Sequence, residues 1–355
     1  MRVFGGHVLV LAGHSFDEEG PYLQLADMVA REQVRYHMLG KTFSLTRLPQ
    51  RRCTGRYSLL TGEREVCPLN VELPSDNKDN SCPACMEATG FNPSFYYAAL
   101  VSPQQRAYNE TPHYNYLAYF APGFAKAGIS AEVRGIRRLL DQGARAARIV
   151  GRFDNAYDAR ELEAALCAQS GIYETMRASK KVELLANTRF DFEEACRELD
   201  AAAAKVDLAA FDSKPLFGEG VDAVERTDGG RAASNAAADV SIASSGAPSA
   251  VSGKTPLDAA MARLGRGAQQ AYFDFTSEYF GGAPAPSCDT MQLVDAGESV
   301  YAGRCIGVVG STLVLEQGGA NYLASLAGWE SHVVELSENE VLREYDFAPM
   351  QMSLL

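Results

Sequence analysis

The chain of 355 residues lacks any long apolar run. No window reaches the roughly 18 uninterrupted apolar residues that a membrane-spanning helix requires. The N-terminal apolar run Val8–Ala12 is shorter than the core of a signal peptide and is more typical of a β-strand. We therefore expect a cytoplasmic protein that makes no use of a membrane and whose eight cysteines are reduced.

Positive charge is also scarce, with 33 Lys+Arg against 45 Asp+Glu and a formal net charge of −12. This balance excludes a surface that binds nucleic acid everywhere, because phosphate binding requires concentrated cations. The charge is unevenly distributed, since residues 281–355 hold ten acidic and two basic residues while residues 100–152 hold eight basic and three acidic ones. A local phosphate-binding patch in the middle of the chain is therefore compatible with the composition.

Aromatic residues are absent from 218 to 271, and residues 228–254 are almost wholly Ala, Ser, Gly, Asn and Asp. Such a segment cannot bury enough apolar surface to offset its ordering entropy. Strand-like alternation near both ends and helical periodicity in the middle predict an α+β fold. The predicted units are an N-terminal β-rich unit (1–50), a four-cysteine zinc module (51–98), a central α+β unit (99–212), a flexible insertion (213–270) and an acidic β-rich C-terminal unit (271–355).

Four cysteines, Cys53, Cys67, Cys82 and Cys85, fall within 33 residues of a segment that has little apolar core of its own. The turn Cys82-Pro83-Ala84-Cys85 presents two thiolates to one cation, and the other two cysteines complete a tetrahedron. Zinc held in this way would be structural, because sulfur fills all four positions. The alternative is four reduced, partly buried thiols. Free core thiols are expected at Cys167, Cys196, Cys288 and Cys305.

The basic stretch, residues 100–152, is predicted to contain two strands, Tyr114–Phe120 and Phe124–Ser130, followed by a helix at Ala131–Gln142. Arg134 and Arg138 would share the solvated face of this helix. Its buried stripe would comprise Val133, Ile136, Leu139 and Leu140. Arg137 lies at the border of that stripe. DNA or RNA would bind through the helical segment Arg134–Arg148, and the alternative is an ordinary amphipathic helix with solvated arginines.

The run from His113 to Ala144 carries the motifs Tyr116-Leu117-Ala118, Lys126-Ala127-Gly128-Ile129-Ser130 and Arg138-Leu139-Leu140-Asp141-Gln142-Gly143-Ala144. It resembles a bacterial family of proteins with a domain of unknown function that also carry an upstream cysteine cluster. The resemblance extends over most of the chain, including the C-terminal strand region around Gly307–Gly310. The central unit is, in addition, similar to the core of the GIY-YIG nuclease superfamily, a β-hairpin followed by helices.

The similarity to the GIY-YIG core implies a catalytic site. Tyr116 matches the tyrosine of the first motif, and Lys126-Ala127-Gly128 matches the second. Arg137 or Arg138 matches the arginine that contacts the scissile phosphate. Glu163 matches the ligand of one divalent cation, Mg²⁺ or Mn²⁺, and Glu161 is its less favoured neighbour.

Two positions depart from that pattern. Lys126 replaces the tyrosine of the second motif, and Asn187 is the available candidate for a late asparagine of the core. The implied function is a metal-dependent endonuclease, in which Tyr116 or a water molecule acts in proton transfer, or a relative that binds nucleic acid without cutting it. His113 lies before the first strand, where a histidine is more often structural.

Two other classes of function stay open at this point. One is a non-catalytic protein-interaction module, in which the zinc module and the acidic C-terminal unit bind a protein partner. The other is an enzyme that acts on a small phosphorylated molecule with the same arginines and the same metal ligand.

Overall fold

The computed structural model describes residues 7–92, 101–211, 213, 272–338 and 345. The predicted flexible insertion, 213–270, lies outside the described residues except for Ser213. Within the described ranges no helix is both long enough and apolar enough to cross a membrane. The mixture of helices and antiparallel strands confirms the α+β prediction.

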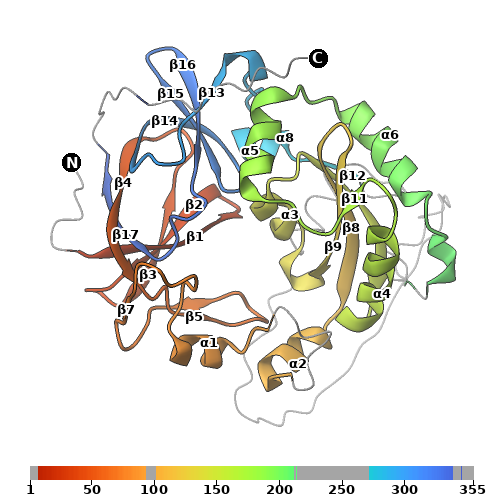
Figure 1. Ribbon diagram of the computed structural model, residues 1–355, viewed down its shortest axis with the longest axis horizontal. Coiled ribbons are helices and arrows are strands. Elements are labelled where there is room, and N and C mark those ends of the chain that lie inside the picture. The colour runs from red at the N-terminus through yellow and green to blue at the C-terminus, as the bar shows by residue number, and fades with distance from the viewer. Residues whose placement is uncertain (1–6, 93–100, 212, 214–271, 339–344, 346–355) are drawn as a thin grey trace, which may run out of the picture.

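Strands from both ends of the chain form one ten-stranded sheet, which we call the terminal sheet (Figure 1). Its N-terminal strands are β1 (Leu9–Asp17), β2 (Gly20–Asp27), β3 (Glu32–His37), β4 (Thr42–Arg52) and β7 (Glu72–Leu73). Its C-terminal strands are β13 (Met291–Leu293), β14 (Val300–Val309), β15 (Thr312–Gln317), β16 (Ala320–Ser325) and β17 (His332–Ser337). The order is β13-β16-β15-β14-β4-β17-β1-β2-β3, with β7 paired to β4.

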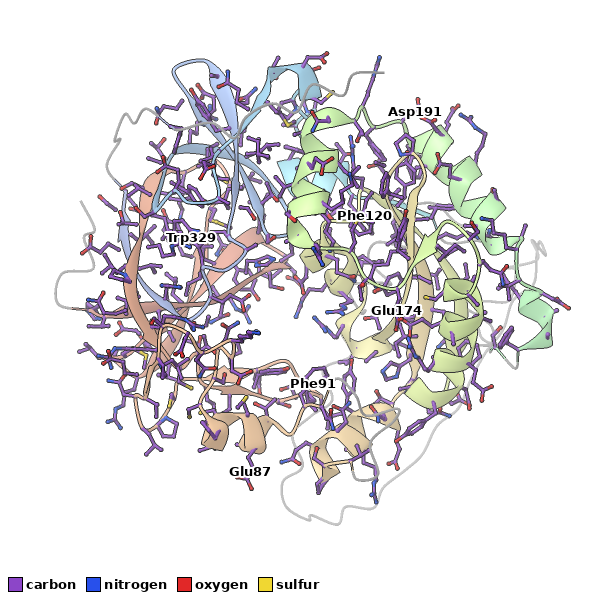
Figure 2. The ribbon with its side chains drawn as sticks, viewed as in Figure 1. Glu87, Phe91, Phe120, Glu174, Asp191 and Trp329 are labelled. Carbon is purple, nitrogen blue, oxygen red and sulfur yellow. The ribbon has the colours of Figure 1, made fainter. Side chains whose placement is uncertain are left out.

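The N-terminal and C-terminal β-rich pieces, which the sequence analysis separated, are therefore joined in space. Strand β4 pairs with β14 on one side and β17 on the other, so that Leu45 lies between Tyr301 and Leu336. Trp329, labelled in Figure 2, is buried in this sheet region and stacks on Tyr301 with ring centroids 4.3 Å apart. Neither end of the chain can complete this apolar core alone.

The central unit is built on a five-stranded sheet with the order β11-β9-β8-β10-β12. Its strands are β8 (His113–Ala121), β9 (Phe124–Ala131), β10 (Ala146–Phe153), β11 (Ile172–Tyr173) and β12 (Tyr272–Asp274). The predicted hairpin is confirmed as β8 and β9, which turn at Gly123 with a φ of 75°. Strand β12 follows the insertion, so the start of the predicted C-terminal unit completes this central sheet.

Helices cover both faces of the central sheet. One face carries α4 (Ala156–Cys167) and α6 (Phe192–Ala203), whose apolar side chains form a core of their own with Leu117 and Tyr119. On the other face, α3 (Arg137–Gln142) and α5 (Ala178–Asn187) pack between the central sheet and the terminal sheet. Helix α8 (Thr276–Phe280) joins this shared core. The two sheets are thus connected by continuous apolar packing.

The helix predicted at Ala131–Gln142 is wrong in its first half. A 3₁₀ turn at Glu132–Arg134 is followed by Gly135 with a φ of 49°, a left-handed conformation that ends the turn before α3 begins. Ile136, Leu139 and Leu140 are buried as predicted, but Val133 is exposed. The segment Arg134–Arg148 is likewise not one helix, because Arg148 lies in β10. Helical periodicity over residues 190–210 predicts helix beyond α6 as well, where the chain forms only a short 3₁₀ turn at Leu208–Ala210.

The cysteine module, residues 51–92, contains little regular structure, as its composition predicts. Its elements are β5 (Arg56–Tyr57), β6 (Arg64–Glu65), β7 and α1 (Pro83–Thr89), and α2 (Pro103–Asn109) follows it. Arg51 is buried and ties this module to the terminal sheet. Its Nε donates to Ser331 Oγ at 2.9 Å, and its guanidinium donates to the backbone carbonyls of Asn77 and Asp79.

At one point the backbone of the terminal sheet contacts the backbone of the central unit with no side chain between them. Gly310, in the turn between β14 and β15, faces Gly143, which ends α3 in a left-handed conformation. A Cβ atom on Gly310 would lie 2.7 Å from the backbone nitrogen of Gly143. No side chain fits between these two turns without moving the units apart.

We predict that Gly310→Ala lowers the free energy of unfolding by about 1 to 3 kcal/mol more than Gly123→Ala does. Both glycines have a positive φ, so both substitutions carry the cost of a left-handed alanine. A Cβ atom on Gly123 meets nothing within 4 Å, whereas one on Gly310 meets backbone. Urea unfolding measures the difference, and equal losses for the two variants would contradict the close contact.

Candidate metal centre and cationic cavity

The four cysteines of the cysteine module come together as one cluster. The sulfur atoms of Cys53, Cys67, Cys82 and Cys85 all lie within 4.8 Å of one another, and all four residues are buried free thiols. The Sγ atoms of Cys67 and Cys82 are 4.0 Å apart. A tetrahedral zinc ion with Zn–S bonds of about 2.3 Å holds its sulfur ligands roughly 3.8 Å apart. These residues therefore fit a structural metal ion such as zinc.

The local backbone explains how the thiols converge. Cys82 precedes α1, and Pro83 starts the helix where no intrahelical N–H is needed, so that Cys85 follows on the first turn. Gly55 has a φ of 94°, and a Cβ atom there would lie 1.9 Å from the carbonyl oxygen of Glu65. This close approach brings the segment after Cys53 against the one before Cys67.

Backbone hydrogen bonds favour the thiolate form that a metal binds at this cluster, whereas burial opposes it. The backbone N–H groups of Cys82 and Gly55 donate to Cys53 Sγ at 3.1 and 3.4 Å. Burial raises the pKa of Cys53 to about 11, and it also raises the pKa of Cys85. A bound cation would release the thiol protons and stabilise the four closely spaced thiolates that burial alone disfavours.

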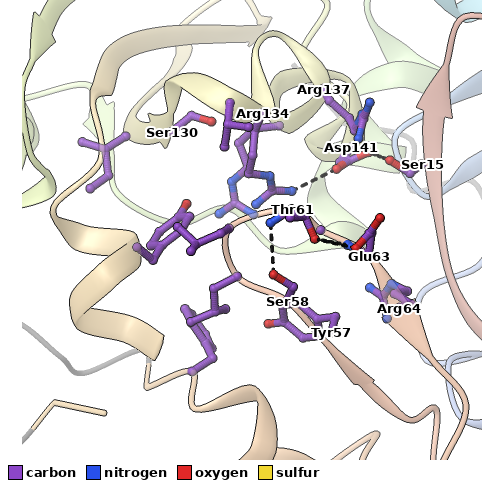
Figure 3. A pocket seen from close by; sticks show the side chains of 18 of the residues that line it. Ser15, Tyr57, Ser58, Thr61, Glu63, Arg64, Ser130, Arg134, Arg137 and Asp141 are labelled. Carbon is purple, nitrogen blue, oxygen red and sulfur yellow. Dashed lines mark hydrogen bonds and ion pairs between the residues drawn. The ribbon is translucent and has the colours of Figure 1, made fainter. Parts of the chain in front are cut away.

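A cavity of about 930 Å³ lies between the terminal sheet, the cysteine module and the central unit. The central unit contributes side chains from β8, β9, α3 and α4, and the terminal sheet contributes side chains from β1, β2 and β3. The opposite wall is the hairpin of β5 and β6, residues 56–65, which we call the module hairpin. Figure 3 shows its side chains Ser58, Thr61 and Glu63 across from Arg134 and Arg137.

All five residues that the GIY-YIG similarity singled out line this cavity: Tyr116, Lys126, Arg137, Arg138 and Glu163. Tyr116 on β8 lies opposite Gly128 on β9, where a Cβ atom would be 2.3 Å from the tyrosine Oη. The buried ring of Tyr116 therefore occupies the space that a Cβ atom at position 128 would take. The Oη of Tyr116 accepts a hydrogen bond of 2.7 Å from Gln142 Nε2 at the end of α3.

Cations crowd on this side of the cavity. The Nζ of Lys126 donates to Ala127 O at 3.0 Å and lies 5.8 Å from the centroid of the Tyr116 ring. Burial, reinforced by the like charges of Lys126 and Arg138, lowers the pKa of the nearby Lys181 to about 8. Among the described residues, none of these three cations forms an ion pair with a carboxylate.

The arginines at the start of α3 differ in their partners. Arg134 donates to Asp141 at 3.2 Å, and the same carboxylate accepts a 2.8 Å hydrogen bond from Ser15 on β1 (Figure 3). Arg137 and Arg138 are half-buried and have no carboxylate partner within the described part of the chain. Half-buried guanidinium groups without a counter-ion favour the binding of an anion such as a phosphate.

Glu163 is buried on α4, at the border of the apolar face formed by Ala159, Leu162 and Leu166. Arg160 donates to Glu163 Oε2 at 2.5 Å and, through its other nitrogen, to Glu174 at 2.6 Å. A divalent cation would therefore share the Glu163 carboxylate with Arg160. One carboxylate suits Mg²⁺, which keeps several waters and is often completed by substrate phosphates.

Residues 103–218 match the model of a family described as a protein of unknown function, DUF2797. The DUF2797 domain contains β8 to α6, and with them all five residues named above. No curated protein and no solved structure matches the chain.

Of the other candidate residues of the DUF2797 domain, Asn187 and Glu161 lie apart from this constellation, whereas His113 lines the cavity. Asn187 donates to Glu183 O within α5 and does not line the cavity, and Glu161 is exposed on α4. His113 is buried at the cavity and its Nδ1 donates to Thr111 O at 2.7 Å. Burial lowers the pKa of His113, so the ring is neutral at pH 7. Its buried Nε2 has no hydrogen-bond partner among the described residues.

Sequence reasoning missed the module hairpin as a wall of the cavity. Its loop, Ser58-Leu59-Leu60-Thr61-Gly62-Glu63, has neither strand nor helix periodicity, so nothing in its composition indicates where it lies. It also missed Arg35 and Tyr22 of the terminal sheet, which line the far side. The only available signal was the position of the hairpin between two predicted metal ligands, Cys53 and Cys67.

We predict that the purified protein contains about one zinc ion per chain and that Cys85→Ser loses most of it, because three thiolates and a hydroxyl hold zinc less tightly. Cys196→Ser, on α6 and outside the cluster, is the matched control and should retain the metal. Elemental analysis by mass spectrometry measures both. Equal metal content in the two variants would contradict the assignment.

Proposed function

We propose that this protein processes nucleic acids, and that its DUF2797 domain binds a phosphodiester backbone in the cavity and hydrolyses it with the help of Mg²⁺ or Mn²⁺. The main support is that one cavity holds Tyr116, Lys126, Arg137, Arg138 and Glu163 together. These residues come from two strands and two helices, and they are the ones that the GIY-YIG similarity assigns to one site.

The charges around the cavity favour a phosphate group as the ligand. The chain is acidic as a whole, yet Lys126, Arg137 and Arg138 line this cavity without a carboxylate partner among the described residues. Keeping cations close together without a carboxylate is unfavourable unless an anion binds between them. A phosphodiester supplies such an anion, and guanidinium groups bind its oxygens with matching geometry.

The residues of the cavity suit phosphodiester hydrolysis. The oxygen of a water molecule forms a bond to phosphorus while one P–O ester bond breaks, and the departing oxygen takes up a proton to leave as an alcohol. A divalent cation at Glu163 would neutralise phosphate charge. Arg137 and Arg138 stabilise the charge that develops on the phosphoryl oxygens. Tyr116, held by Gln142, is placed to move a proton through its Oη.

The order of elements agrees with this proposal. The hairpin of β8 and β9 is followed by α3 with the arginines and then by α4 with Glu163, which is the order that the GIY-YIG similarity implies. Lys126 stands on β9 where that similarity would place a tyrosine, and its ammonium group adds positive charge beside Tyr116. We therefore assign Lys126 to phosphate binding.

We predict that Glu163→Gln reduces Mg²⁺-dependent cleavage of oligonucleotides by about 100-fold or more, because an amide is a poor ligand for the cation. The amide oxygen can still accept the hydrogen bond from Arg160, so the fold is maintained. Glu161→Gln, exposed two residues earlier on the same helix, should cleave at the wild-type rate. Gel analysis of a mixed DNA and RNA pool measures the rates.

Undiminished cleavage by Glu163→Gln would remove Glu163 from the reaction. Absence of cleavage by the wild-type protein, together with salt-sensitive binding, would indicate a relative that binds without cutting. Absence of both would favour a protein-interaction module stabilised by its metal centre.

We predict that replacing Arg137 and Arg138 by alanine weakens oligonucleotide binding and makes it less sensitive to salt. Each lost phosphate contact should reduce the slope of log K against log salt concentration by roughly 0.7 to 0.9. Arg148→Ala is the control, because Arg148 pairs with Asp200 at 2.9 Å outside the cavity. Fluorescence anisotropy at several salt concentrations measures the slopes, and a change of the same size in the control would contradict the assignment.

A further inference from the structure

The module hairpin closes the cavity on the side opposite α3. Its loop is internally bonded, since the backbone N–H of Thr61 donates to Ser58 Oγ at 3.1 Å and Thr61 Oγ1 donates to Glu63 at 3.2 Å (Figure 3). The arginines of α3 therefore face a structured wall of the same chain, and a ligand that reaches them must enter the space between.

The cysteine cluster holds the module hairpin at both of its ends. Cys53 precedes β5 and Cys67 follows β6, so two of the four clustered cysteines flank the module hairpin. Within it, Arg56 pairs with Glu65 at 2.6 Å, and the backbone N–H of Tyr57 donates to Thr89 on α1. The wall is thus part of the cysteine module, which limits how far the cavity can widen.

The size of the cavity limits the form of the nucleic acid. Its volume of about 930 Å³ falls in the range of pockets that enclose small ligands, roughly 300 to 1,000 Å³. A base-paired helix needs an open groove or surface along several base pairs, because both of its strands must be accommodated. A few nucleotides of one strand fit the space between the module hairpin and α3, whereas a duplex would need a wider groove.

Apolar side chains in the cavity match exposed bases. Three of the large apolar side chains that are exposed in the described chain line this one space, namely Leu60 (41%), Phe91 (50%) and Val133 (56%). Phe91, labelled in Figure 2, lies at the cysteine-module end of the space. Tyr57 and Tyr108 line it as well. Unpaired bases stack on such side chains, whereas bases inside a duplex are already stacked on each other.

We infer that the substrate is single-stranded nucleic acid, with phosphates bound by Arg137 and Arg138 and with unpaired bases packed against Phe91 and the apolar side chains of the module hairpin. This inference rests on the proposed function and specifies its substrate. It is carried by the presence, in one cavity, of guanidinium groups without a carboxylate partner among the described residues and of exposed apolar side chains.

The first test compares strands of one sequence in four forms: single-stranded DNA, single-stranded RNA, and the duplex of each with its complement. In the presence of Mg²⁺ we expect kcat/KM for a single strand to exceed that for the duplex by about tenfold or more, because the duplex must first unpair. The DNA and RNA arms identify the preferred sugar. Equal rates on single strands and duplexes, both lost in Glu163→Gln, would overturn this inference and leave the proposed hydrolysis intact.

The second test uses binding without cleavage, measured by anisotropy in EDTA-free buffer lacking Mg²⁺ and Mn²⁺. Phe91→Ala should weaken single-strand binding by roughly 5- to 100-fold, the loss expected for one stacked base. Leu69→Ala, in the same module and 68% exposed but outside the cavity, should bind as the wild type does. Single-strand binding that Phe91→Ala leaves unchanged, or duplex binding that is tighter, would overturn the inference even if hydrolysis is observed.

Discussion

The pairing of β4 with β14 on one side and β17 on the other is the constraint on which the rest of the structure depends. This pairing brings the two ends of the chain together in one sheet, and that sheet packs against α3. Ser15 on β1 then bonds Asp141, which in turn holds Arg134. Strand pairing between the two ends of the chain therefore fixes how the arginines of α3 stand relative to the opposite wall of the cavity.

The arginines and lysines of this acidic chain differ in whether a carboxylate neutralises them. Arg134, Arg148, Arg152 and Arg160 are each bound to a carboxylate, whereas the cations nearest Tyr116 are not. Burial, and then the like charges of Lys126 and Arg138, lower the pKa of the neighbouring Lys181 to about 8, in keeping with a local excess of positive charge. An anion in the cavity would relieve it, and such local sacrifice of stability is common where a protein binds a ligand.

The sequence was informative where local pattern determines structure. Alternation predicted the β8–β9 hairpin, and the spacing of Cys82 and Cys85 predicted a cluster of thiols. Apolar spacing alone predicted one helix through Gly135. The positive φ of this glycine interrupts that helix. The closure of the sheet at β4 and the place of the module hairpin could not be predicted, since both depend on partners far away along the chain.

The same closure has a consequence for how the chain folds during synthesis. Strand β4 ends at Arg52 and β14 begins at Val300, so at about 5 to 20 residues per second the ribosome takes roughly 12 to 50 seconds to deliver the partner. Throughout this interval both edges of β4 lack their C-terminal partners and can pair wrongly. The central unit can form most of its sheet meanwhile, because β8 to β11 all lie within residues 113–173. Because its paired strands lie far apart in the sequence, formation of the terminal sheet is expected to be the slow step of folding and the step most sensitive to aggregation.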